Sequence, residues 1–131
     1  MPIIEHFIAG FRQILVETEG VEYAFIFGSS VKALRSGGDV DILVDGRLSF
    51  AEKVDLEMKL ESIVKKKVDI VQTEEAFPEI IMKAFSRGIK IVVKNNKKLK
   101  EDYFKYLYAY EDGENLRRLR MARIRRKYNN G

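Results

Sequence analysis

Asp39 and Asp41, two aspartates separated by one residue, lie in the apolar stretch 39–44. An earlier apolar stretch, residues 25–27, ends in a Gly-Ser turn. Side chains two positions apart on a β-strand point to the same face of the sheet, so both carboxylates would project together. Carboxylate oxygens are the ligands that a hard divalent cation such as Mg²⁺ prefers. At the turn, Gly28, Ser29 and Ser30 would offer backbone N–H groups to a phosphate where a strand leads into a helix. Together these features indicate a site for a nucleoside triphosphate and its metal.

Each of these motifs is weak when it stands alone. A Gly-Ser turn occurs throughout ordinary α/β proteins, and an Asp-x-Asp pair also occurs on the solvated face of surface strands. The combination is more specific, because a further aspartate, Asp69, lies between Val68 and Ile70. An aspartate in an apolar strand costs free energy unless it is solvated, paired or metal-bound. The alternative for Asp69 is a strand-end residue that faces water after a run of three lysines. The combination favours the metal site.

This pattern resembles the minimal nucleotidyltransferase (MNT) family of the polymerase-beta-like nucleotidyltransferase superfamily. The signature of that family is a hydrophobic residue with Gly-Ser or Gly-Gly, a spacer, and Asp-x-Asp or Asp-x-Glu between hydrophobic residues. Phe27-Gly28-Ser29 and the stretch around Asp39 and Asp41 match it. The family has a third carboxylate on a later strand, for which Asp69 is the candidate. The resemblance covers roughly residues 1–95.

The resemblance implies a reaction and a role for each of these residues. A nucleoside monophosphate would pass from a nucleoside triphosphate to a hydroxyl acceptor, with release of pyrophosphate. Asp39 and Asp41 would hold two Mg²⁺ ions, which can stabilise the attacking and leaving oxygens. Asp69 would complete the acceptor-side metal site and help to activate the hydroxyl as a general base. The Gly28–Ser30 turn would bind the phosphates, with Ser30 in reserve for Ser29. We expect magnesium to raise the thermal stability of such a site.

The resemblance also implies a partner. The family commonly occurs with a helical HEPN protein, as the antitoxin of a HEPN/MNT toxin–antitoxin pair, and some members add AMP to a tyrosine of that partner. We therefore expect an Mg²⁺-dependent protein adenylyltransferase with ATP as co-substrate. Two alternatives stay open. One is a non-catalytic antitoxin or binding module that acts through the C-terminal helix. The other is a small-molecule nucleotidyltransferase, for which 131 residues leave little room for an acceptor-binding domain.

The composition excludes several other classes of protein. The chain has 46% hydrophobic and 34% charged residues, which is typical of a globular protein. It has no cysteine and a single histidine, His6, so disulfides, a thiolate nucleophile and a Ser/His/Asp hydrolase are poorly supported. No apolar run is long enough to span a membrane, and no secretory signal pattern begins the chain. We expect a cytoplasmic protein that does not bind membranes.

Strands alternate with helices along the first part of the chain. This order predicts an α/β (α+β) domain of the nucleotidyltransferase fold, with a mixed sheet of about four strands and helices packed on it. A Ser49/Glu52 capping box predicts the start of the central helix, and Gly88 predicts the end of the next. The predicted strands are residues 22–27, 39–44, 67–72 and 89–93, and the predicted helices are residues 2–18, 29–34, 49–64 and 77–87.

The C-terminal tail differs from the rest in composition. Residues 97–131 contain eleven Lys or Arg and five Asp or Glu, whereas the rest of the chain has a net charge of −2. We assign residues 1–95 to the minimal nucleotidyltransferase domain and residues 96–131 to its aromatic, basic and helical extension. Asp112-Gly113 would interrupt this extension, which is either a long helix or a helix pair. It would dock on the domain, bind a HEPN-like protein partner or bind nucleic acid; of the two partner classes, protein ranks above nucleic acid. Homo-oligomers stay open.

Overall fold

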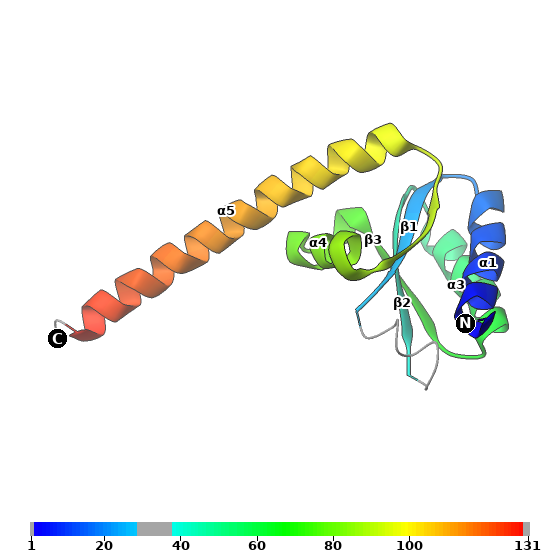
Figure 1. Cartoon of the computed structure of the whole chain (residues 1–131), viewed down its shortest axis with the longest axis horizontal. Coiled ribbons are helices and arrows are strands. Elements are labelled where there is room, and N and C mark those ends of the chain that lie inside the picture. Colours follow the sequence, from blue (N-terminus) through cyan, green and yellow to red (C-terminus); the bar gives the residue numbers. More distant parts are fainter. Residues whose placement is uncertain (1, 29–37, 130–131) are drawn as a thin grey trace.

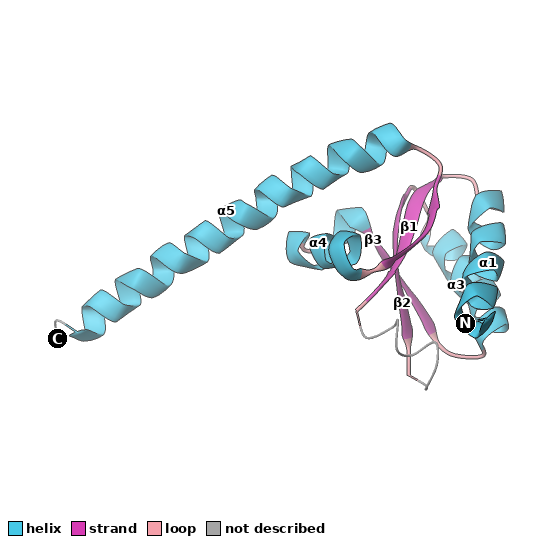
Figure 2. Cartoon of the chain, viewed as in Figure 1, coloured by secondary structure: helices cyan, strands magenta, loops and turns pink. Residues whose placement is uncertain are grey.

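The computed structural model of the chain describes residues 2–28 and 38–129. A four-stranded sheet in the order β3-β2-β1-β4 forms its centre (Figures 1 and 2). Strand β1 pairs antiparallel with β2 and β4, and β2 pairs parallel with β3, so the predicted mixed α/β sheet is confirmed. The elements are α1 (Pro2–Glu17), β1 (Val21–Phe27), β2 (Val40–Gly46), α3 (Phe50–Val64), β3 (Val68–Gln72), a 3₁₀ turn (Thr73–Glu75), α4 (Pro78–Arg87), β4 (Ile89–Val93) and α5 (Asn96–Asn129).

The two faces of the sheet carry two separate apolar clusters. Helices α1 and α3 cover one face and α4 covers the other, as Figure 1 shows. In β2, Val40, Ile42 and Val44 belong to the cluster under α1 and α3, whereas Leu43 belongs to the cluster under α4. This alternation follows from the period of two in a strand. It places the intervening aspartates, Asp41 and Asp45, on the α4 face.

The predicted strand and helix bounds within the described residues agree with the structure to within one residue, except at the end of β2. We predicted a strand over residues 39–44 closed by an Asp45-Gly46 turn, but β2 begins at Val40 and continues to Gly46. Asp45 stays in the strand because it is buried and finds polar partners there. The short helix that we predicted over residues 29–34 lies outside the described residues.

Two predicted helix boundaries are formed as expected. The Ser49 hydroxyl accepts a hydrogen bond from the Glu52 backbone N–H at 3.1 Å, and the Glu52 carboxylate accepts one from the Ser49 N–H at 2.9 Å. This capping box starts α3. At the end of α4, a Cβ on Gly88 would collide with the carbonyl oxygens of Ala84 and Ile26. Glycine therefore lets α4 end directly against strand β1.

Side chains from the α1–α3 layer cover both edges of the sheet. At the β3 edge, the backbone N–H groups of Val68 and Ile70 donate to the carboxylates of Glu61 and Glu57 on α3, at 3.2 and 2.8 Å. At the β4 edge, Arg12 Nε donates to the Ile91 carbonyl at 2.9 Å. An open strand edge is a template for pairing with another chain. These contacts satisfy part of each edge and limit sheet extension.

Helix α5 is one continuous element of 34 residues. The prediction that Asp112-Gly113 interrupts it is wrong: a glycine inside a helix costs only about 1 kcal/mol, which the flanking helical turns outweigh. Leu99 and Tyr106 pack against the cluster under α4, and the remainder of the helix leads away from the sheet (Figure 1). None of the helices in the described part of the chain combines the length and apolar character needed to cross a bilayer.

Candidate active site

The structure brings Asp41 and Asp69 together. They are register partners in the parallel pair β2·β3, and Phe27 of β1 is the partner of Asp41 on its other side. Neighbouring strands lie about 4.8 Å apart, and the register puts both carboxylates on the α4 face at the same level of the sheet. Both residues are half-buried. Two aspartates that are 28 positions apart in the sequence therefore lie side by side on one face of the sheet.

Asp39 and Gly28 lie at the same end of the sheet. Asp39 is exposed and precedes β2 by one residue, so it approaches the strand rather than belonging to it as we predicted. The Val40 N–H donates to the Lys67 carbonyl at 2.9 Å, which fixes this approach beside the start of β3. Gly28 follows β1 with a φ of 67°, a left-handed conformation that favours glycine. Ser29 and Ser30 lie outside the described residues.

Among the residues that the structure describes, the surroundings of Gly28 are open. A Cβ built on Gly28 would meet no described atom within 4 Å. Glycine is needed here for its backbone conformation and not for a lack of space. A ligand could therefore approach the backbone closely at the end of β1.

The donor set at this end of the sheet suits a hard divalent cation, because it consists of carboxylate oxygens. The side chains do not yet close around one point: within residues 2–28 and 38–129, no group of three or more His, Asp or Glu side chains is arranged to hold a metal ion. The Asp69 carboxylate lies 3.9 Å from Lys67 Nζ, in a pair whose side chains are 44% and 65% exposed. An exposed pair of this kind is weak, so Asp69 can exchange this contact for another cation.

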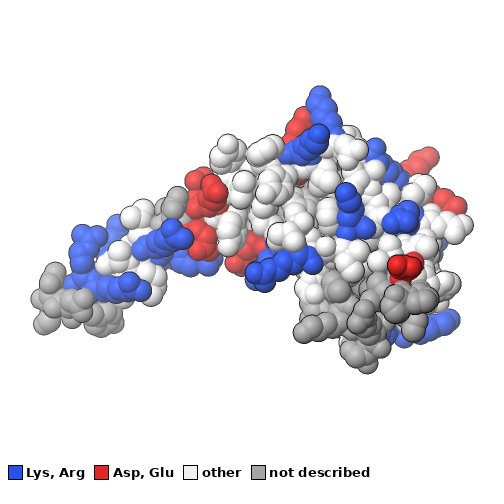
Figure 3. Space-filling model, in the orientation of Figure 1, with Lys and Arg blue, Asp and Glu red and all other residues white. Residues whose placement is uncertain are grey.

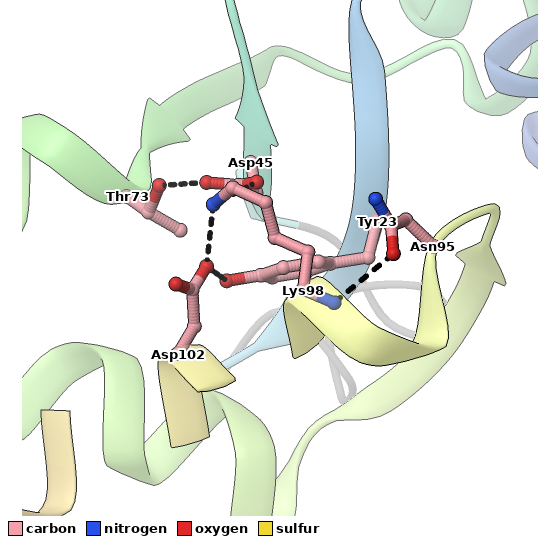
Figure 4. Close-up of polar contacts among 6 residues, drawn as sticks. All are labelled: Tyr23, Asp45, Thr73, Asn95, Lys98 and Asp102. Atoms are coloured by element: carbon pink, nitrogen blue, oxygen red, sulfur yellow. Dashed lines mark hydrogen bonds and ion pairs between the residues drawn. The ribbon is translucent and has the colours of Figure 1, made fainter. Parts of the chain in front are cut away.

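A second polar cluster, which we did not predict, lies at the other end of β2. This Lys98 cluster consists of Tyr23, Asp45, Thr73, Lys98 and Asp102 (Figure 4). The Tyr23 hydroxyl and Lys98 Nζ both donate to Asp102 Oδ2, at 2.6 and 2.8 Å. Thr73 donates to Asp45 Oδ1 at 2.5 Å. Lys98 Nζ also lies 2.8 Å from Asp45 Oδ2, an ion pair without the angle of a well-directed hydrogen bond.

Burial and charge shift the pKa values of the Lys98 cluster. Burial raises the pKa of the Tyr23 phenol well above its usual value, and the hydrogen bond to Asp102 and the nearby carboxylates raise it further. For Lys98, desolvation alone lowers the pKa, but Asp102 and Asp45 outweigh it and raise the pKa above its usual value. The cluster therefore keeps a neutral phenol and a charged amine at neutral pH. It anchors the first turns of α5 to the sheet.

Only one part of this cluster had a signal in the sequence. Lys98 and Asp102 are four residues apart, the spacing of an ion pair on one helix face. Asp45 is two strand positions beyond Leu43 and so shares a face with it, but its Asp-Gly context indicates a turn. The contact between Tyr23 and Asp102 joins residues 79 positions apart and has no local signal.

Comparisons with known proteins agree with the fold and the order of these elements. Residues 11–97 match the family described as Polymerase beta, Nucleotidyltransferase. Among curated proteins, none matches the sequence significantly.

Several solved structures with a similar fold are toxin–antitoxin complexes. One is a toxin–antitoxin complex with AMP-PNP, with a TM-score of 0.72 and 18% identity over 89% of this chain and 97% of the other. Another is a tri-AMPylated Shewanella oneidensis HEPN toxin in complex with an MNT antitoxin, with a TM-score of 0.71 and 18% identity over 92% and 97% of the two chains. At these identities the likeness is one of fold, whereas the family match spans most of the chain. The chain therefore belongs to the polymerase beta nucleotidyltransferase family, with the fold found in MNT antitoxins that are paired with HEPN toxins.

Proposed function

We propose that this protein transfers AMP from ATP to a hydroxyl group of a HEPN-like partner protein, and that the transfer depends on Mg²⁺. The observation that carries the proposal is the register of Asp41 and Asp69 on adjacent parallel strands in a nucleotidyltransferase family member. The fold neighbours also support the proposal. One of them is a complex with AMP-PNP, and another is a complex with an AMPylated HEPN toxin.

In this proposal Asp39, Asp41 and Asp69 are the metal-binding carboxylates. Bound Mg²⁺ would neutralise charge on the triphosphate and on the leaving pyrophosphate. Asp69 would accept the proton of the attacking hydroxyl. The Gly28–Ser30 turn would bind the phosphates, where the open space around Gly28 admits them. Residues 1–95 would carry this chemistry, with residues 96–131 as an extension of the same domain.

The position of Asp69 suits a large acceptor. It lies on β3, the outer strand of the sheet on this side, and its side chain is 44% exposed. A hydroxyl on the surface of another protein could reach such a position without entering a deep cavity. The exposed aromatic side chains of α5 would contribute to partner docking, since aromatic residues are enriched at interfaces. They are Tyr103, Phe104, Tyr108 and Tyr110.

The test is a calorimetric titration of ATP with Mg²⁺ into the wild type and into Asp39→Asn/Asp41→Asn. A control variant, Asp55→Asn/Asp112→Asn, removes two exposed carboxylates from α3 and α5. We expect saturable binding that needs Mg²⁺, is lost in the first variant and persists in the control. We also expect Mg²⁺ to raise the melting temperature of the wild type and not of the first variant. Binding that is unchanged in Asp39→Asn/Asp41→Asn would reject the assignment of the site.

A second candidate function is a non-catalytic binding module. It is favoured by the long exposed part of α5 and by carboxylates that do not close around one point among the described residues. The two functions differ in their need for nucleotide. A HEPN-like partner that forms a complex and gains no label from α-labelled ATP and Mg²⁺ would favour the module. Label that appears on the partner and is lost with Asp41→Asn would favour the transferase.

A further inference from the structure

The distal part of α5 carries a dense positive charge. We define the arginine segment as residues 117–126, which contain six arginines and no acidic residue. Every residue of the segment is exposed, and Figure 3 shows Lys and Arg side chains gathered along this end of the helix. The arginines are Arg117, Arg118, Arg120, Arg123, Arg125 and Arg126.

The charge of the arginine segment is distributed around the whole helix. Successive residues of an α-helix turn by about 100°, so six arginines at these spacings point to all sides. The exposed apolar residues do not form a continuous stripe: Met121 and Ile124 share a face as a single pair, and Leu119, which is 64% exposed, lies on the opposite side of the helix. A helix that docks in the groove of a protein presents apolar anchors on one face. The arginine segment offers only the Met121–Ile124 pair, and arginines flank that pair.

The choice of arginine over lysine is also specific to this segment. Six of the ten arginines of the chain lie in these ten residues, whereas the four cations of residues 97–105 are all lysines. Arginine and lysine both make a protein surface hydrophilic. The planar guanidinium, however, presents a fork of donors that matches phosphate oxygens and the major-groove edge of guanine. The composition of the segment suits a ligand that offers these groups.

The cations of the arginine segment have few partners among the described residues. Arg117 pairs with Glu114 at 2.9 Å and lies 3.9 Å from Glu79 on α4. Among the described residues, the side chains of residues 118–126 make no hydrogen bond or ion pair, although their backbone groups take part in the helix. The helix here leads away from the sheet, so a ligand could surround it (Figure 1). Like charges three residues apart also repel, and a polyanion would relieve this repulsion.

We propose that the arginine segment binds duplex DNA by lying in the major groove, with arginines directed to the phosphates of both strands. The major groove of B-form DNA is about 12 Å wide and admits an α-helix, whereas that of A-form RNA is too narrow and deep. Ten helical residues extend about 15 Å, which corresponds to four or five base pairs. This binding is separate from nucleotidyl transfer and uses no residue of the candidate active site.

The test is fluorescence anisotropy with a labelled DNA duplex of random sequence, titrated with the full chain at several salt concentrations. Neutralisation of four to six phosphates predicts that affinity falls about a hundred- to a thousandfold between 50 and 200 mM salt. Arg118→Gln/Arg120→Gln/Arg123→Gln should weaken binding at least about tenfold and flatten the salt dependence. A matched variant, Lys97→Gln/Lys100→Gln/Lys105→Gln, removes the same charge from the proximal part of α5 and should bind nearly as the wild type.

Three outcomes would overturn the proposal. The first is no binding at low salt by a wild type whose circular dichroism shows the expected helix. The second is an equal loss of DNA affinity in the two triple variants, which would mean that binding depends only on the net charge of the protein. The third is tighter binding to an RNA hairpin than to the DNA duplex, which would assign the segment to RNA. Duplex binding that is salt-dependent and specific to the three arginines would support it.

Discussion

The two ends of strand β2 give the same residue type opposite environments. Asp41 and Asp45 lie on one face of the strand, four residues and about 13 Å apart. Asp45 is 5% exposed and contacts Thr73 and Lys98. Asp41 is half-buried, and its register partner is a second aspartate, Asp69. At one end of the strand a carboxylate contacts one cation and one hydroxyl, and at the other end the register places two aspartates side by side.

We infer from this difference that the Asp45 end stabilises the fold, whereas the Asp41 end carries the proposed function. A buried carboxylate that has its partners within the protein contributes to a fixed structure, here the attachment of α5 through Lys98 and Asp102. Two carboxylates at one level of a sheet repel each other, and a cation bound between them would relieve this repulsion. We therefore expect substitutions at the Lys98 cluster to change stability and substitutions at the Asp41 end to change activity.

The largest expected effect is a difference in the rate of AMP transfer between variants at the two ends of β2. Asp41→Asn should lower the rate of AMP transfer about 10²–10⁴-fold, because a lost metal ligand removes several kcal/mol of charge stabilisation. Asp45→Asn should change the rate less than about threefold and should instead lower the melting temperature. Both rates would be measured with labelled ATP and the proposed HEPN-like partner. Equal rate losses in the two variants would contradict the separation.

The next effect separates the ends by stability. Asp102→Ala removes the acceptor of both Tyr23 and Lys98. It should lower the free energy of unfolding by about 1–3 kcal/mol, less than for a fully buried pair because Lys98 is 40% exposed. Urea denaturation measures this change. Glu101→Ala is the control, since its pair with Lys97 is exposed and 4.0 Å long; the two variants should differ by at least about 1 kcal/mol.

The Lys98 cluster should also give the protein an alkaline pH dependence. The folded-state pKa values of Tyr23 and Lys98 are both raised. Their contribution is therefore complete below the unfolded pKa values, near pH 10, and is lost as the pH rises above them. For Tyr23 the loss approaches about 1.4 kcal/mol per pH unit. Melting temperatures measured across this range should fall less steeply in Tyr23→Phe, and an unchanged slope would exclude Tyr23 as the cause.

The smallest effect concerns the ion pair beside the candidate active site. Lys67→Gln removes the 3.9 Å contact to Asp69, and both side chains of this pair are substantially exposed. The free energy of unfolding should change by less than about 0.5 kcal/mol. Urea denaturation again provides the measurement. A loss above about 1 kcal/mol would mean that the Asp69 end is stabilised like the Asp45 end.

Much of the fold follows from local pattern. The period-two alternation of β2 and the capping box at Ser49 placed the strand and α3 to within two residues. Asp45 was misassigned to a turn because its partners, Thr73 and Lys98, lie far along the chain. The proposed roles of Asp39, Asp41 and Asp69 stay predictions, although two of these residues are neighbours in the sheet.

The sequence by itself determined the order of the strands and helices along the chain, the family signature and the acidic character of the candidate active site. These depend on short-range spacing, which a single chain displays directly. Only the tertiary structure decided that Asp69 lies in register with Asp41, that Asp45 anchors α5 through Lys98, and that the arginine segment stands away from the sheet. The physical reason is that a partner many residues away fixes a side chain's role, and strand register and helix docking select that partner.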